Sequence, residues 1–181
     1  MSLEIVNVVG AGQLNTELDL ENLANDIDAY SVKYDPEFYP GMYVEISEDS
    51  PTITVYTNGK YHITGSKSTD ELFETRDDFL LALDEHSINY SIDDDEFGIK
   101  NLVCTTEYES ELNLHTLSVG LGLENVEYEP EIFPSITYRL PDSEAVILIF
   151  RTGKLVIQGV TSFEDAKHAY QEFKSVMNNL S

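Results

Sequence analysis

The residues that could perform catalysis or bind a metal are few in this chain and lie far apart. The four histidines have no paired nucleophile, and the single cysteine, Cys104, excludes an internal disulfide and a cysteine-built zinc site. The sequence has no G-x-S-x-G turn, no glycine-rich phosphate loop and no H-E-x-x-H pair. The acidic run at residues 93–96 lacks the spacing of a calcium loop, which favours a solvated linker. We therefore expect no enzyme, no metal site and no cofactor.

The charge of the chain is strongly negative. Ten Lys and Arg stand against 34 Asp and Glu, which gives a formal net charge of -24. This balance is the opposite of the basic surface of an ordinary nucleic-acid binder, although the apolar and aromatic content is that of a folded chain. The sequence starts without a signal segment, and no apolar run approaches the roughly 18 residues that a membrane span needs. We expect a cytoplasmic protein without a membrane segment.

The chain contains an internal repeat. Shifting the sequence by 94 positions overlays its two halves without a gap, and 20 of the 87 overlaid residues are identical. Background composition would give about five or six identities, and matched Asn, Pro and Gly at one constant offset indicate a duplication. We therefore expect two similar halves, residues 1–92 and residues 93–181.

Each half contains the same predicted order of elements. A strand-like segment comes first, followed by a short helix over about residues 18–29 in the first half and 112–123 in the second. Short strands come next, and the turns at residues 58–59 and 152–153 predict a hairpin in each half. A longer helix closes each half, and Ser162 is the expected N-cap of the second one.

One face of each predicted sheet is left uncovered. Two helices can cover only one face of about five strands. An open antiparallel face is normally polar, yet residues 146–150 and 155–157 are all apolar. Such a face implies a partner, which is either a ligand or a second copy of the chain in a homodimer. The pattern alone leaves both alternatives open.

The repeat and its segments resemble the TATA-binding protein family. The similarity rests on N-x-V near the start of each half, YEPEIFPSITYRL at residues 128–140 and ILIFRTGKLVIQG at residues 147–159. It covers almost the whole chain and is closer in the second half. The resemblance implies an α+β saddle in which two pseudo-symmetric repeats form one curved antiparallel sheet of ten strands. Four helices would cover its convex face, and DNA would lie under its concave face.

The resemblance also implies which residues contact DNA. The family inserts four rings between base steps to kink the duplex, and these correspond to Tyr39, Tyr56, Phe133 and Phe150. Without the resemblance, rings in strands would more simply be assigned to a core. The central asparagines correspond to Asn7 and Asn101, whose amides can meet the A N3 and T O2 acceptors of the minor groove. The other implied contacts are Val9, Thr64, Val103, Arg139, Leu148 and Val156.

The departures from the family pattern lie mainly in the first half. Both wedges there are Tyr where the family has Phe, so each hydroxyl must find a hydrogen-bond partner or be desolvated at a cost. Glu45 stands at the position of Arg139, where the family has a phosphate-contacting basic residue. His62 and Thr54 replace Val and Leu on the expected DNA face. These replacements bear on how tightly the first half holds DNA.

The negative charge has two explanations. The hairpin regions beside the open face hold six of the ten basic residues, namely Lys33, Lys60, Lys67, Arg139, Arg151 and Lys154. In a salt-rich cytoplasm the Debye length falls to about 3 Å at 1 M, so distant repulsion nearly vanishes. This explanation predicts an archaeal, halophilic source. The alternative is an acidic paralogue that binds a protein by imitating DNA, and a negative concave face would favour it.

The resulting hypothesis is a general transcription initiation factor. It would bind and bend A·T-rich promoter DNA through the minor groove. By the same resemblance, Glu129 and Glu131 in the YEPE segment match the carboxylates that contact a TFIIB-type factor. The alternative is a paralogue of the same fold that binds a protein partner rather than DNA. Whether the free chain forms a homodimer stays open.

Overall fold

The computed structural model describes residues 2–86, 88–91 and 97–180. Within these residues the chain forms four α-helices and one antiparallel sheet of ten strands. The strand order is β2-β3-β4-β5-β1-β6-β10-β9-β8-β7. The predicted α+β class with a ten-stranded antiparallel sheet is confirmed. The expected linker at residues 93–96, and with it the boundary between residues 92 and 93, lies outside the described residues.

The chain divides into two compact units. The first unit is Asn7–Lys100, and the second combines Asn101–Ser181 with Met1–Val6. The elements of the first half are β1 (Glu4–Gln13), α1 (Leu20–Asp26), β2 (Ser31–Lys33), β3 (Met42–Glu45), β4 (Thr52–Val55), β5 (Lys60–Ser66) and α2 (Thr69–Glu85). Those of the second half are β6 (Gly98–Glu107), α3 (Leu114–Gly120), the 3-10 helix η2 (Leu123–Asn125), β7 (Val126–Glu127), β8 (Ser135–Arg139), β9 (Val146–Phe150), β10 (Lys154–Val160) and α4 (Phe163–Leu180).

Equivalent elements of the two halves stand at the offset found in the sequence. Strands β1 and β6, helices α1 and α3, and strands β5 and β10 each begin and end 94 residues apart. The backbone therefore follows the same path in both halves without an insertion, as expected for a duplicated unit.

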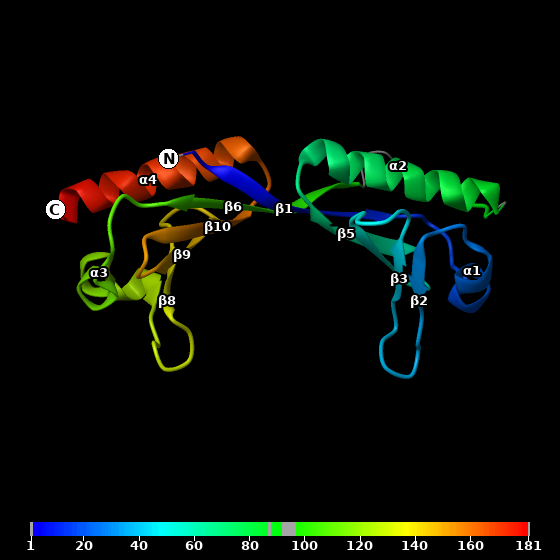
Figure 1. The fold of residues 1–181 in the computed structure, drawn as a ribbon, viewed down its shortest axis with the longest axis horizontal. Coiled ribbons are helices and arrows are strands. Elements are labelled where there is room, and N and C mark those ends of the chain that lie inside the picture. Colours follow the sequence, from blue (N-terminus) through cyan, green and yellow to red (C-terminus); the bar gives the residue numbers. More distant parts are fainter. Residues whose placement is uncertain (1, 87, 92–96, 181) are drawn as a thin grey trace. The chain divides into compact units, whose positions relative to one another are not determined.

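The core of each unit lies between one face of its strands and the long helix. Helix α2 packs against β5, and α4 packs against β10, so each long helix covers the same side of its own strands (Figure 1). The shorter helices α1 and α3 lie at one end of their units, and α3 contacts β8. Phe79 in α2 and Phe173 in α4 occupy equivalent positions, and neither ring is exposed. Both rings anchor a helix to its sheet.

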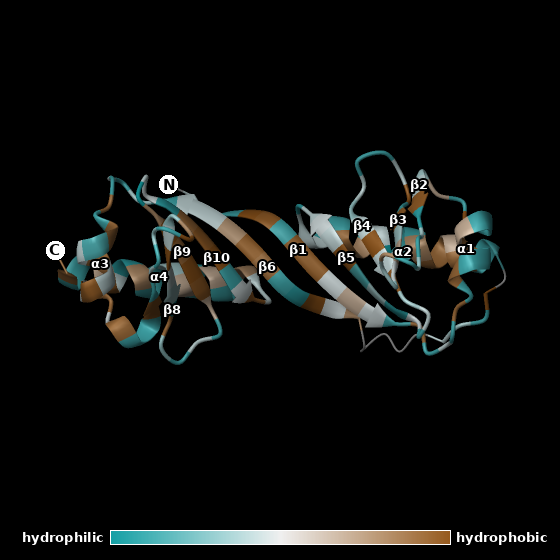
Figure 2. Cartoon of the chain, turned by 90° about the horizontal axis from the view of Figure 1, so that it is seen from below, coloured by the Kyte–Doolittle hydropathy of each residue, from teal (hydrophilic) through white to brown (hydrophobic). Residues whose placement is uncertain are grey.

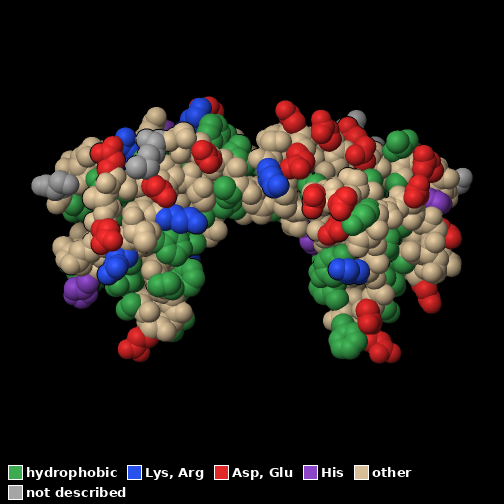
Figure 3. Space-filling view, in the orientation of Figure 1, with side chains coloured by type: hydrophobic (Ala, Val, Ile, Leu, Met, Phe, Trp, Pro, Cys, Tyr) green, Lys and Arg blue, Asp and Glu red, His purple; other side chains and the backbone are tan. Residues whose placement is uncertain are grey.

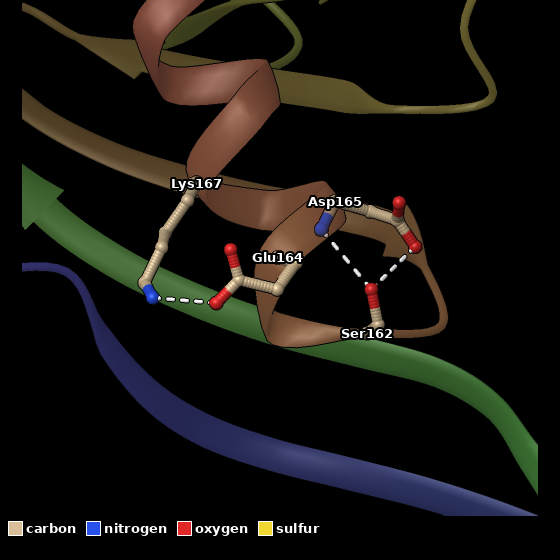
Figure 4. Close-up of polar contacts among 4 residues, drawn as sticks. All are labelled: Ser162, Glu164, Asp165 and Lys167. Carbon is tan, nitrogen blue, oxygen red and sulfur yellow. Dashed lines mark hydrogen bonds and ion pairs between the residues drawn. The ribbon is translucent and has the colours of Figure 1, made fainter.

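Side-chain caps begin the long helices. The Ser68 hydroxyl accepts a hydrogen bond from the Glu71 backbone N–H in α2. At the start of α4, the Ser162 hydroxyl accepts from the backbone N–H of Asp165 at 3.1 Å and donates to its carboxylate at 2.6 Å (Figure 4). Glu164 also pairs with Lys167 at 2.7 Å. The N-cap predicted at Ser162 is confirmed, and the acidic first turn is favourably placed at the positive end of the helix.

The short helices and the hairpin turns differ slightly from the prediction. Helix α1 begins at Leu20 rather than near residue 18 because the Asp19 side chain caps it, and Asn113 caps α3 in the same way. The hairpins keep Gly59 and Gly153 at positive φ, 80° and 92°, as turn glycines. Each hairpin loop is longer than the predicted two-residue turn. Strand β4 already ends at Val55 and β9 at Phe150, before the turn residues begin.

Candidate nucleic-acid interface

Each unit has a second sheet face that its long helix does not cover. In β9, half-buried Val146, Leu148 and Phe150 alternate with fully buried Ile147 and Ile149. Because neighbouring side chains in a strand point to opposite faces, the half-buried set lies on the open face. The residues predicted to contact DNA lie on these open faces or in the adjoining loops: Asn7 and Val9 in β1, Tyr39 before β3, Tyr56 after β4, Thr64 in β5, Asn101 and Val103 in β6, Phe133 before β8, Arg139 in β8, Leu148 and Phe150 in β9, and Val156 in β10.

Strand register aligns one row of side chains across the open face of the second unit. The row runs from Thr105 through Val156 and Leu148 to Thr137 and Glu127. In the view from below, hydrophobic residues follow one another along β9 and β10 (Figure 2). The middle of this row therefore presents hydrocarbon and no hydrogen-bonding side chain.

The equivalent row of the first unit has a different chemistry. It runs from Ala11 through His62 and Thr54 to Tyr43 and Lys33. Hydrophilic residues interrupt β5 where β10 is apolar (Figure 2). His62 and Thr54 thus replace the aliphatic Val156 and Leu148, and the aromatic Tyr43 replaces Thr137.

Two asparagines are held in the same way in both units. The Asn7 Oδ1 atom accepts a hydrogen bond from the Gly65 backbone N–H at 2.9 Å, and Asn101 Oδ1 accepts from Gly159 N–H at 2.9 Å. Because a backbone N–H can only donate, these bonds fix which end of each amide is the oxygen. The Nδ2 group of each asparagine is left as a donor beside the open face.

The glycines that orient the asparagines were not predicted. Gly65 and Gly159 have positive φ, 93° and 77°, next to an irregularity in the β1–β5 and β6–β10 pairing. A Cβ at Gly159 would lie 2.5 Å from the Glu144 carbonyl oxygen. The sequence did contain a signal, since Gly65 and Gly159 are identical across the repeat and each lies 58 residues after its asparagine.

The predicted wedge rings of the second unit form a pair. Phe133 is 47% exposed, and its ring centroid lies 6.1 Å from that of Phe150 in an edge-to-face arrangement. The backbone N–H of Phe133 donates to the Glu129 carbonyl oxygen, which closes the turn before β8. Two apolar edges are therefore held at the outer end of the open face.

The wedge rings of the first unit are linked through their hydroxyls. The Tyr39 and Tyr56 oxygens are 2.6 Å apart, and the Tyr39 ring stacks on Tyr43 with centroids 5.2 Å apart. This hydrogen bond, together with partial burial, raises the pKa of Tyr56 to about 12. Each predicted wedge hydroxyl thus has a partner within the protein, and Tyr43 joins a cluster that sequence reasoning had not placed there.

His62 lies beside this tyrosine cluster. Its ring centroid is 5.7 Å from that of Tyr56. Partial burial lowers the pKa of His62 from its ordinary value, which favours the neutral form of the ring. A neutral imidazole offers one donor and one acceptor to a molecule on the open face.

The charges at the outer edge of the open faces are arranged oppositely in the two units. Arg139 pairs with Glu127 at 3.1 Å, and both side chains are largely exposed, so the pair contributes little to stability. The first unit has Lys33 and Glu45 at these two positions, with the signs exchanged. Glu45 accepts a hydrogen bond from the Thr52 hydroxyl instead.

The two units also differ in the charge of equivalent clefts, and that of the first unit lies beside β1 and β5. It has a volume of about 820 Å³, and Lys60, Lys100 and His62 are among the residues that line it. The equivalent cleft beside β6 and β10 has about 470 Å³ and is lined by Lys154 together with Glu4 and Glu107. Lys100 was not among the predicted contacts.

The open faces carry nearly balanced charge although the chain is strongly acidic. The charged residues that cross-strand pairing places there are Lys33, Glu45, Lys60, Glu107, Glu127, Arg139 and Lys154. Acidic side chains gather instead over α2 and at the loop tips (Figure 3). The described open faces are therefore not negative, which was the feature expected of a protein that imitates DNA.

The loops before β3 and β8 project exposed residues. Glu129 and Glu131 are exposed in the second unit, with Ile132 79% exposed next to them. The corresponding loop of the first unit exposes Phe38 at 86%. Within the described ranges, His, Cys, Asp and Glu side chains form no metal-binding group, and no helix is long and apolar enough to cross a membrane.

Comparisons with known proteins agree with this geometry. The sequence model of the family described as "Transcription factor TFIID (or TATA-binding protein, TBP)" matches residues 2–86 and 96–180. The chain is 43% identical to TATA-box-binding protein C of Halobacterium salinarum over 180 residues, which covers 99% of both chains. It is 37% identical to the TATA-box-binding protein of Haloarcula marismortui, covering 99% of this chain and 95% of that protein. Several similar chains thus come from halophilic archaea, in agreement with the salt-adapted, archaeal source predicted from composition.

A solved structure shares the whole fold. The Methanococcus jannaschii TBP is 34% identical, superposes with a TM-score of 0.84, and covers 99% of both chains. The match therefore extends over both halves of the chain. On sequence and on fold, the chain belongs to the TATA-binding protein family, whose members are general transcription initiation factors and not enzymes.

Proposed function

We propose that this chain binds A·T-rich promoter DNA through the minor groove, using the open faces of both units. The observation that carries the proposal is the fixed orientation of Asn7 and Asn101, each of which presents an amide donor beside an open face. A and T present only acceptors, N3 and O2, in the minor groove. Each donor, with half-buried Val9 or Val103 two residues further along the same strand, suits those acceptors.

The ring pairs support bending of the bound DNA. Tyr39 with Tyr56, and Phe133 with Phe150, each stand at the outer end of an open face. Apolar rings that enter between base steps unstack them and kink the duplex, which requires a few kcal/mol per step. The near neutrality of the open faces fits contact with sugars and base edges, and the acidic helices lie on the other side (Figure 3).

High salt makes the acidic chain compatible with DNA. At molar salt the repulsion between distant carboxylates and phosphates is screened within about 3 Å. We expect DNA affinity that persists or increases in molar KCl, opposite to the usual loss through counterion release.

The test is a salt series of affinity for a TATA-containing duplex. Wild type is compared with Phe133→Ala and Phe150→Ala, and His168→Gln, at a 74% exposed side chain of α4, serves as the control. Both ring variants should bind more weakly at every salt concentration, because wedges act independently of charge. Equal affinity of wild type and both ring variants would contradict the wedge assignment, and no binding at any salt would contradict DNA binding.

The exposed loop before β8 is the proposed contact for a TFIIB-type factor. Glu129 and Glu131 project there beside the exposed side chain of Ile132. Glu129→Lys and Glu131→Lys should reduce ternary-complex formation with a purified TFIIB-type factor while leaving binary DNA binding intact. Unchanged ternary complexes would place this partner elsewhere.

A further inference from the structure

The two open faces differ most in hydrogen-bonding capacity at one pair of equivalent positions. His62 in β5 lies between Ala11 and Thr54, whereas Val156 in β10 lies between Thr105 and Leu148. Both side chains are half-buried on the open side of their strands. One position therefore offers a polar ring and the other offers only methyl groups.

The minor groove contains one feature that can distinguish these surfaces. A·T and T·A pairs show only acceptors there, whereas a G·C pair adds the guanine N2 amino group as a donor. Against Val156 and Leu148 this amino group would lose its water and gain no partner. A buried donor without a partner is costly, so the aliphatic surface selects against guanine.

His62 has the opposite property. Among the described residues, the ring makes no hydrogen bond or ion pair, and its contact with Tyr56 is through the ring. A neutral imidazole keeps one nitrogen lone pair free as an acceptor. Partial burial favours that neutral form.

There is also room at His62 for the edge of a nucleotide. The ring lines the cleft of about 820 Å³, and Ala11, the neighbour on β1, contributes only a methyl group. Lys60 and Lys100 line the same cleft and can meet a phosphate beside the base pair.

We propose that His62 allows the first unit to accept a G·C pair in its half of the DNA site, by accepting a hydrogen bond from the guanine N2 amino group. The second unit, with Val156 and Leu148 in the equivalent row, requires A·T pairs in its half. The inference rests on the proposed minor-groove function and assigns to His62 a role in sequence preference.

The experiment uses inosine to isolate the amino group. Inosine pairs with cytosine but lacks the N2 amino group, so an I·C pair presents the same minor-groove acceptors as A·T. Single A·T pairs of a TATA-containing duplex are replaced, one position and one strand at a time, by G·C or by I·C. Affinities are measured in molar KCl for wild type, His62→Val and the control His168→Gln, whose side chain is 74% exposed on α4.

The expected result is a preference for guanine that depends on His62. At one or more positions, wild type and His168→Gln should bind the G·C duplex about fivefold more tightly than the I·C duplex, the effect of one net hydrogen bond. His62→Val should lose or reverse this preference. Because Val occupies the equivalent position 156, the variant is expected to fold, and an unchanged unfolding midpoint verifies this.

Two negative outcomes have separate meanings. If wild type binds the A·T duplex but never prefers guanine over inosine, or if His62→Val shows the same preference as wild type, the inference about His62 is wrong. If wild type binds none of the duplexes at any salt concentration, the proposed function itself fails.

Discussion

On the open side of the first unit, the central row is polar and aromatic, with His62, Thr54 and Tyr43; on the second it is mostly aliphatic, with Val156 and Leu148. The helix-covered sides share fully buried residues at equivalent positions, namely Ile53 and Ile147, Ile63 and Ile157, and Phe79 and Phe173. The duplicated scaffold thus constrains these core positions more than it constrains the positions on the open faces. A side chain at a core position must fill a fixed volume, whereas a side chain on the open face is constrained only by the molecule that binds there.

The largest expected effect is a loss of stability, which tests whether the equivalent rings of the two cores contribute equally. Phe79→Ala and Phe173→Ala should each destabilise the protein by about 3–5 kcal/mol, because each removes a fully buried ring between helix and sheet. Denaturant unfolding at molar salt measures the loss. Leu81→Ala, at a 58% exposed position of α2, should stay within about 0.5 kcal/mol of wild type. A large difference in destabilisation between the two Phe variants would show that the two cores are not equivalent.

A smaller effect is expected for the wedge rings. Phe133→Ala should weaken DNA binding by about 2 kcal/mol, roughly 30-fold. Tyr39→Ala should weaken it less, because the wild-type Tyr39 must surrender the 2.6 Å bond to Tyr56 or carry its hydroxyl into the groove. Gel-shift titrations on one duplex measure both variants. A greater loss for Tyr39→Ala would show that the first unit dominates binding.

The asparagines should behave alike in both units. Asn7→Asp and Asn101→Asp keep an oxygen for the Gly65 and Gly159 N–H groups but replace the outward donor by an acceptor. The new oxygen would face the A N3 and T O2 acceptors, so each variant should lose about tenfold in affinity. The unfolding midpoint should change little. A loss in only one unit would show that the two halves do not contact DNA equivalently.

The smallest effect concerns the tyrosine hydroxyls. Tyr39→Phe should lower the pKa of Tyr56 from about 12 toward 10, because the hydrogen bond to Tyr39 is the main cause of its elevation. The raised pKa favours the protonated hydroxyl in the folded state. Its contribution to stability is therefore complete below pH 10 and is lost as pH rises from 10 to 12. Ultraviolet titration of tyrosinate in both proteins measures the shift, and an unchanged Tyr56 titration would contradict it.

Much of the fold could be predicted from the sequence because the repeat supplies most structural signals twice. Each element has a second copy at the same offset, so Gly59 and Gly153, or Phe79 and Phe173, reinforce one assignment. Helix ends were less predictable, since the caps at Asp19 and Asn113 decide where the short helices begin. The family resemblance, rather than periodicity, supplied the expected site residues.

The contacts that shape the candidate interface could not be predicted in the same way. The bond from Gly65 to Asn7 joins residues far apart in sequence and depends on an irregular strand register. The Tyr39–Tyr56 bond likewise requires a loop and a strand end to converge. Local propensity contains no information on such pairs, which form only when the chain folds.

The rows that contain His62 and Val156 differ, so the two halves of the molecule are not equivalent toward DNA. A protein with two identical halves related by a two-fold axis would bind any duplex in either sense with equal free energy. Unequal halves separate the two senses in energy whenever the base pairs at the two ends of the site differ. Under the proposed function at promoters, such a bias would determine which flanking gene is read.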